Sequence, residues 1–107
     1  MSDVLNRLDA TIAARRAQGD STASHTAALL AKGPLKCAEK FGEEAVEAVI
    51  AAAAQGPDDL ANECADVVYH MAVMLAARGL SLADVVAILE AREGISGVEE
   101  KASRGAE

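Results

Sequence analysis

Apolar residues recur at intervals of three and four along most of this chain, which is the repeat of an amphipathic α-helix. No stretch alternates apolar and polar residues for long enough to predict a strand. A chain of 107 residues has room for one domain and not for two. The sequence therefore predicts an all-α fold in a single domain, residues 1–107, with a polar tail at 93–107.

Glycine, proline and serine residues divide the chain into its helices. The expected boundaries are a first helix that stops at Gly19, a short segment that stops at Lys32-Gly33, a main helix from Pro34 to about Ala54, a second long helix from Asp58 or Asp59 to Gly79, and a last helix with Ser81 as its N-cap. The two long helices are joined by a short turn, so we expect an antiparallel helical hairpin with shorter helices beside it.

The second long helix is almost wholly apolar from Val67 to Ala77. A helix that is apolar all round has to be covered on more than one side. A chain of this length buries only about two thirds of its unfolded surface, so its other helices are not enough to cover it. We therefore expect a homodimer, or a larger helical bundle, with this helix at its centre.

Charge and cysteine content limit the partners and the compartment. The net charge is −7 and aromatic residues are almost absent, so neither a basic surface nor a stacking platform for nucleic acid is expected. Cys37 and Cys64 lack the spacing of a zinc site, and we expect both to be reduced and buried. The longest apolar run, residues 64–77, is too short to cross a bilayer. These features predict a soluble, cytoplasmic protein without a nucleic-acid or membrane partner.

Four acidic side chains can come together if the long helices face each other. Glu44 and Glu47 are one turn apart on the main helix, and Glu63 and Asp66 are one turn apart on the second. Four converging carboxylates need a counter-charge, and among oxygen ligands Mg²⁺ or Mn²⁺ fits best. The alternative is a solvated acidic face, which is common on helices. Glu63 and Asp66 favour the metal, because they stand at the entrance of the most apolar helix.

A helical wheel of the main helix separates an apolar side from a charged side. The apolar side comprises Leu35, Ala38, Val46, Val49, Ile50 and Ala53, and the charged side comprises Lys36, Lys40, Glu43 and Glu47. Together with Lys32, the lysines recur every four residues. They could meet a string of phosphates, or they could form ion pairs along the helix.

The acidic spacing resembles a known signature. Glu43-Glu44-x-x-Glu47, then fifteen residues, then Glu63-x-x-Asp66 is similar to the EExxE...ExxD pattern of the MazG-like nucleoside triphosphate pyrophosphohydrolases. Further matching segments are Ser24-His25-Thr26, Lys32-Gly33, the stretch from Lys36 to Glu47, Asp66-x-x-Tyr69-His70, and the tail from Ser96 to Arg104. Together they resemble the phosphoribosyl-ATP pyrophosphohydrolase family over about residues 5–104.

The resemblance implies a Mg²⁺-dependent hydrolase that assembles as helical dimers or tetramers. Its reaction would convert phosphoribosyl-ATP to phosphoribosyl-AMP and pyrophosphate, the second step of histidine biosynthesis, by attack of water at the α-phosphorus. The implied metal ligands are Glu44, Glu47, Glu63 and Asp66. Glu43 could position or deprotonate the attacking water, or it could hold a lysine.

Several other residues are candidates for substrate contacts. Phosphates could meet Lys32, Lys36 and Lys40, and also Lys101 and Arg104 in a tail that would close over the substrate or be disordered. His70 lies one turn after Asp66 and could orient it, or it could simply pack in the bundle.

Two other functions fit the same pattern. A related house-cleaning enzyme for noncanonical nucleoside triphosphates would use the same carboxylates with a different base pocket. A non-catalytic helical oligomerisation module would leave its acidic stripe solvated and would bind no Mg²⁺.

Overall fold

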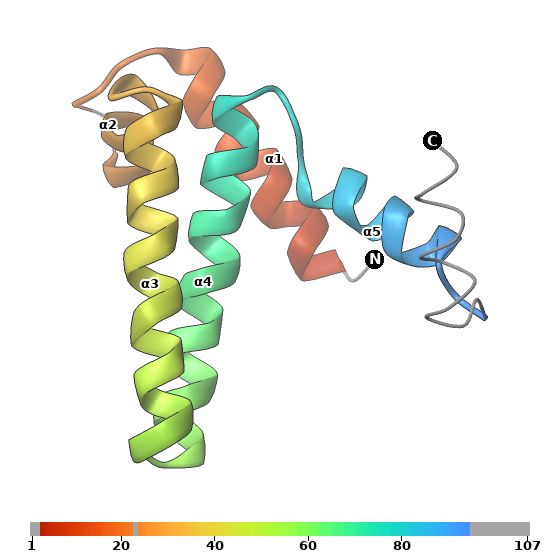
Figure 1. Ribbon diagram of the computed structural model, residues 1–107. Helices are drawn as coiled ribbons and strands as arrows, with labels where there is room; N and C mark the ends of the chain where they lie inside the picture. The colour runs from red at the N-terminus through yellow and green to blue at the C-terminus, as the bar shows by residue number, and fades with distance from the viewer. Residues whose placement is uncertain (1–2, 23, 95–107) are drawn as a thin grey trace.

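The computed structural model describes residues 3–22 and 24–94, which form five α-helices and no strand (Figure 1). The helices are α1 (Asp3–Gln18), α2 (His25–Ala31), α3 (Pro34–Ala54), α4 (Pro57–Ala77) and α5 (Leu82–Ala91). The predicted all-α class is confirmed. The predicted boundaries agree closely with these, except that α4 begins at Pro57, with Gly56 as its N-cap and Asp58 and Asp59 in its first turn, and ends at Ala77 and not at Gly79.

Gly33 and Pro34 make the corner between α2 and α3. Gly33 has a φ of 93°, in the left-handed region that glycine adopts without strain. Pro34 begins α3, where its missing N–H costs no helical hydrogen bond. Across the corner, the thiol of Cys37 donates to the carbonyl oxygen of Leu29 at 3.4 Å. These features fix the short α2 against the start of α3.

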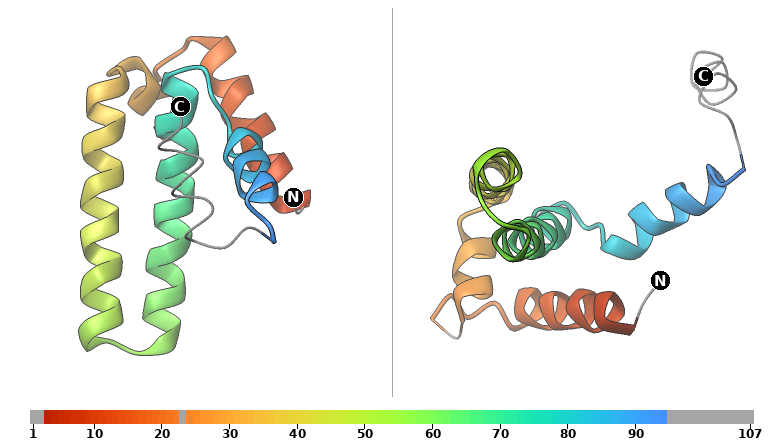
Figure 2. Two further views of the ribbon diagram at one scale, coloured as in Figure 1. Left: turned by 45° about the vertical axis from the view of Figure 1, so that its right-hand side comes forward. Right: turned by 90° about the horizontal axis from the view of Figure 1, so that it is seen from below.

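The long helices α3 and α4 lie side by side and antiparallel, as predicted (Figures 1 and 2). The hydrophobic core gathers at one end of this hairpin, where α1, α2 and α5 pack around the second half of α4. Its buried members are Ile12, Leu29, Cys37, Ala72, Val73, Ala76 and Leu82. The other end of the hairpin, with the turn between α3 and α4, projects past the remaining helices (Figure 2).

The apolar side of α3 faces away from α4. Leu35, Val46, Val49 and Ile50 are 72%, 58%, 66% and 50% exposed. The buried residues of α3 are instead Cys37, Glu44 and Ala51. Small residues on that face let the two helices approach closely, and they bring a glutamate into the interface with α4. Within the described residues, the most apolar face of α3 is therefore left uncovered.

The two cysteines differ in their exposure. Both cysteines are free, as expected, but only Cys37 is buried, so the expectation of burial was wrong for Cys64. Cys64 lies in the first half of α4, whereas the buried residues of this helix begin at His70. No individual helix in the described residues is long and apolar enough to cross a membrane; α4 and α5 meet the length and composition criteria only as a pair bent by 102°.

The start of α5 is capped from a distant part of the chain. Asp9 on α1 accepts hydrogen bonds from the backbone N–H groups of Leu82, at 2.9 Å, and Ala83, at 3.1 Å. These N–H groups belong to the first turn of α5 and have no partner inside the helix. Ser81 occupies the N-cap position, as predicted, and Asp84, three residues later, accepts hydrogen bonds from its backbone N–H, at 2.9 Å, and from its hydroxyl group, at 3.2 Å. Asp9 therefore ties α5 to α1.

Replacing Asp9 should loosen α5. We expect Asp9→Ala to lower the free energy of unfolding by about 1–2 kcal/mol, the usual loss on removal of a helix cap. The stability of Asp9→Asn should lie between those of Asp9→Ala and the wild type. Both carboxylate oxygens of Asp9 accept a hydrogen bond, whereas the amide of asparagine has only one acceptor oxygen. Urea denaturation followed by circular dichroism measures both differences, and equal stability of all three proteins would refute the cap.

Candidate metal centre

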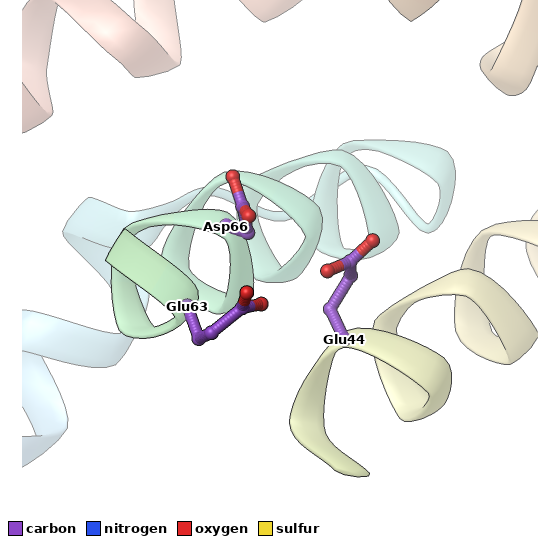
Figure 3. A group of neighbouring side chains, drawn as sticks. All are labelled: Glu44, Glu63 and Asp66. Atoms are coloured by element: carbon purple, nitrogen blue, oxygen red, sulfur yellow. The ribbon is translucent and has the colours of Figure 1, made fainter. Parts of the chain in front are cut away.

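Three of the predicted carboxylates meet between α3 and α4. Glu44 on α3 and Glu63 and Asp66 on α4 each offer an oxygen atom, and these oxygens lie within 4.8 Å of one another. Figure 3 shows Glu44 and Glu63 reaching toward each other across the gap between the helices, with Asp66 one turn further along α4. The three-residue spacing of Glu63 and Asp66 puts both on the face of α4 that meets Glu44.

The fourth predicted carboxylate, Glu47, lies beside this group without being one of its three members. A hydrogen bond between Glu44 and Glu47 lowers the pKa of Glu44 and raises the pKa of Glu47. The cause is that two adjacent carboxylates repel each other, so their hydrogen bond favours the ionised form of Glu44 and the protonated form of Glu47. Glu47 is exposed, so it is well placed to complete a ligand set.

The group fits a hard divalent cation. Glu44 is only 9% exposed, and the Oε2 atom of Glu63 is buried with no hydrogen-bond partner in the described part of the chain. A buried and unpaired carboxylate oxygen is costly, and a bound cation would remove that cost. Oxygens around an octahedral Mg²⁺ ion are at most about 4.2 Å apart, so small side-chain rotations would bring these ligands into range. All the donors are carboxylate oxygens, which Mg²⁺ and Mn²⁺ prefer.

Lys40 supplies positive charge at the edge of the group. Its Nζ atom lies 3.4 Å from Oε1 of Glu44 and 3.5 Å from Oε2 of Glu43. The hydrogen bond to Glu44 raises the pKa of Lys40, so this lysine stays charged. Glu43 is largely exposed and pairs with Lys40, so it lies outside the group of three.

His70 also faces Glu44. Its Nε2 atom lies 3.9 Å from Oε1 of Glu44, across the hairpin. The sequence had suggested Asp66, one turn earlier on the same helix, as its partner. Burial lowers the pKa of His70, so its ring is neutral near pH 7. Its Nδ1 atom is buried and has no hydrogen-bond partner among the residues that the structure describes.

The three predicted lysines, Lys32 just after α2 and Lys36 and Lys40 on α3, line one cleft of about 180 Å³. The cleft is formed by Leu29, Lys32, Lys36, Glu39, Lys40 and Glu43. Lys36 forms an ion pair with Glu39, at 3.0 Å. Lys40 belongs to both the cleft and the edge of the carboxylate group, so the two sites are continuous. Lys101 and Arg104 lie outside the described residues.

Comparison with known proteins identifies the family. The model of the phosphoribosyl-ATP pyrophosphohydrolase family matches residues 5–93. The chain belongs to this family. Its relatives include proteins named phosphoribosyl-ATP pyrophosphatase from Cereibacter sphaeroides strain KD131, Dinoroseobacter shibae and Paracoccus denitrificans. They are 63%, 64% and 60% identical to it, over 95%, 94% and 94% of this chain and 98%, 98% and 92% of their own lengths.

Membership of the phosphoribosyl-ATP pyrophosphohydrolase family confirms the resemblance seen in the sequence and the prediction that the chain is a hydrolase. All the acidic residues of the signature lie inside the matched range. The tail segment from Ser96 to Arg104 lies beyond it.

One contact between α2 and α4 was missed by the sequence interpretation. The hydroxyl groups of Thr26 and Tyr69 form a hydrogen bond that joins α2 to α4. Both residues belong to segments that matched the family, which was the only signal available. Nothing in their spacing, 43 positions apart, indicates a contact.

Proposed function

We propose that this protein hydrolyses phosphoribosyl-ATP to phosphoribosyl-AMP and pyrophosphate, in the second step of histidine biosynthesis. The relatives named above carry the name of this activity and match almost the whole chain. The observation that carries the proposal within this chain is the convergence of Glu44, Glu63 and Asp66, because an anhydride hydrolase of this kind needs a site for a divalent cation.

The carboxylates would hold Mg²⁺, with Mn²⁺ as a possible substitute. In this proposal the ligands come from Glu44, Glu63 and Asp66, with Glu47 completing the set. When bound, the cation neutralises the triphosphate and lowers the pKa of a water molecule. His70 orients Glu44 from across the hairpin.

The cleft lined by Lys32, Lys36 and Lys40 would bind the phosphates of the substrate. With a net charge of −7 the protein repels polyphosphates, so a local cluster of cations is needed to bind one. Lys32, Lys36 and Lys40 provide it beside the carboxylates, and Lys101 and Arg104 would add contacts from the tail. Glu43, exposed at the rim, would position or deprotonate the attacking water.

The active form of the protein would be a homodimer or a larger oligomer, and it would be located in the cytoplasm. The apolar stretch of α4, residues 67–77, is buried or half-buried within this chain, so it does not itself require a second copy, contrary to the expectation from the sequence. The support for an oligomer is instead the exposed apolar side of α3, where a second copy could cover Val46, Val49 and Ile50. The support for the cytoplasm is the presence of free cysteines in an enzyme of a biosynthetic family.

A substrate panel separates this activity from that of a house-cleaning enzyme. Pyrophosphate release from phosphoribosyl-ATP should exceed release from dCTP, dUTP and ITP by about 100-fold or more in kcat/KM, because a site built for polar groups of one substrate rejects analogues that lack them. Comparable or faster release from the noncanonical nucleotides would favour the house-cleaning function.

Mg²⁺ should stabilise the folded protein. At about 100 times its dissociation constant, a ligand that binds only the native state adds ~2.7 kcal/mol, equivalent to roughly 10 °C in melting temperature for a domain of this size. Differential scanning calorimetry with MgCl₂, against NaCl of the same ionic strength, measures this shift. A non-catalytic oligomerisation module predicts equal melting temperatures in the two salts.

A further inference from the structure

Thr26 and Tyr69 have no part in the proposed reaction, yet the hydrogen bond between them involves the residue directly before His70. Thr26 is in the first turn of α2, and Tyr69 is in the second half of α4. Both side chains are half-buried. The bond therefore connects a short helix with the helix that supplies Glu63 and Asp66.

Contacts at both ends of α2 hold Thr26 in place. At its start, the hydroxyl oxygen of Ser24 accepts a hydrogen bond from the backbone N–H of Ala27, at 3.0 Å, so the helix begins at a fixed residue. Near its end, Cys37 on α3 donates to the carbonyl oxygen of Leu29. Because α2 is anchored in this way, the hydroxyl group of Thr26 offers Tyr69 a fixed partner.

Tyr69 in turn packs against His70. The two rings meet edge to face, with centroids 4.8 Å apart and planes at 74°. The ring of His25, the first residue of α2, meets His70 edge to face as well, at 6.5 Å and 88°. His70 is 7% exposed. Its imidazole is thus confined by two rings, of which one belongs to α2 and the other is tied to α2 through Thr26.

The position of the imidazole matters for Glu44. The distance of 3.9 Å between Nε2 of His70 and Oε1 of Glu44 is too long for a hydrogen bond, so the ring acts through the dipole of its imidazole and by filling the space beside the carboxylate. Both effects change if the ring turns. Lys40 approaches the same oxygen from α3, but its side chain is 39% exposed, whereas the ring of His70 is buried.

We propose that Thr26 and Tyr69 are positioning residues for Glu44, so that α2 tunes the affinity of the carboxylate site for its cation. This proposal rests on the proposed function, since it assumes a cation at Glu44, Glu63 and Asp66. Groups that orient a metal ligand without touching the metal are known to alter metal affinity strongly. Thr26 and Tyr69 act on Glu44 only through His70, so their effect on metal affinity should be smaller than that of a residue bonded directly to the ligand.

The test removes each hydroxyl group and keeps the shape of its side chain. Tyr69→Phe and Thr26→Val should each raise the dissociation constant for Mg²⁺ by about threefold to tenfold, measured by isothermal titration calorimetry on the full-length protein without substrate. At saturating Mg²⁺ and phosphoribosyl-ATP, kcat should stay within about twofold of the wild type, because the reacting groups are unchanged. The double variant should bind Mg²⁺ no more weakly than either single variant, since each one already removes the same hydrogen bond.

Ile12→Val is the control for a simple loss of stability. Ile12 is buried on α1 in the hydrophobic core, whose members include none of the carboxylates, so its replacement should lower the melting temperature and leave Mg²⁺ affinity unchanged. Unchanged Mg²⁺ affinity in Tyr69→Phe and Thr26→Val, or independent effects that multiply in the double variant, would overturn the positioning role alone. Failure of the wild-type protein to bind Mg²⁺ would overturn the proposed metal site together with this role.

Discussion

Asp66→Asn and Glu44→Gln should each reduce the hydrolysis of phosphoribosyl-ATP by about a thousandfold or more. Each change keeps the size of the side chain and removes one negative charge from the group that would hold the cation. Stabilisation of transition-state charge by a bound metal contributes several kcal/mol, and each 1.4 kcal/mol is worth a factor of about ten in rate. Pyrophosphate release at saturating substrate and Mg²⁺ measures the loss.

The helical circular dichroism of both variants should match the wild type. Asp66 is exposed, and the amide oxygen introduced by Glu44→Gln can still accept a hydrogen bond from Lys40, so neither replacement disrupts the core. Glu90→Gln on α5 is the matched control, because it removes an exposed charge far from the group and should retain full activity. Glu47→Gln tests whether the neighbouring carboxylate is a fourth ligand. Wild-type turnover in Asp66→Asn or Glu44→Gln would exclude that residue from the metal site.

Val49→Glu should convert the oligomer to a monomer. Val49 is 66% exposed in the isolated chain, on the apolar side of α3, and the proposal places it under a second copy. Burying an unpaired charge in such an interface costs several kcal/mol, which raises the dissociation constant of the assembly by about a hundredfold or more. Sedimentation velocity at micromolar concentrations measures the change in mass.

Val49→Ala is the control for this experiment, because it keeps the surface apolar and should leave the oligomer intact. The isolated Val49→Glu chain should remain helical, since the side chain has no buried contact to lose within its own subunit. A wild-type protein that sediments as a monomer, or a Val49→Glu variant that assembles normally, would contradict the proposed interface.

The sequence was sufficient to predict the helices and the meeting of three of the four acidic residues because both depend on local patterns. Gly33 and Pro34 end one helix and begin the next whatever surrounds them. The three-residue spacing of Glu63 and Asp66 puts them on one face of α4 once the hairpin forms. The turn between α3 and α4 is short, so the hairpin itself was predictable.

Other features could not be predicted because they depend on how distant segments pack. Asp9 caps a helix that begins 73 positions later, and nothing in the sequence around either residue indicates that contact. The wheel separated the apolar and charged sides of α3 correctly but did not show which of them faces α4. His70 approaches Glu44 because of the distance and rotation between two helices, whereas sequence spacing favoured Asp66.

The most direct test of the central claim is a crystal of the protein soaked with Mn²⁺. The account predicts an anomalous difference peak between α3 and α4, at about 2.2 Å from carboxylate oxygens of Glu44, Glu63 and Asp66, and loss of that peak in Asp66→Asn. A well-ordered crystal with these three carboxylates free of manganese, or with the ion bound elsewhere on the protein, would contradict it.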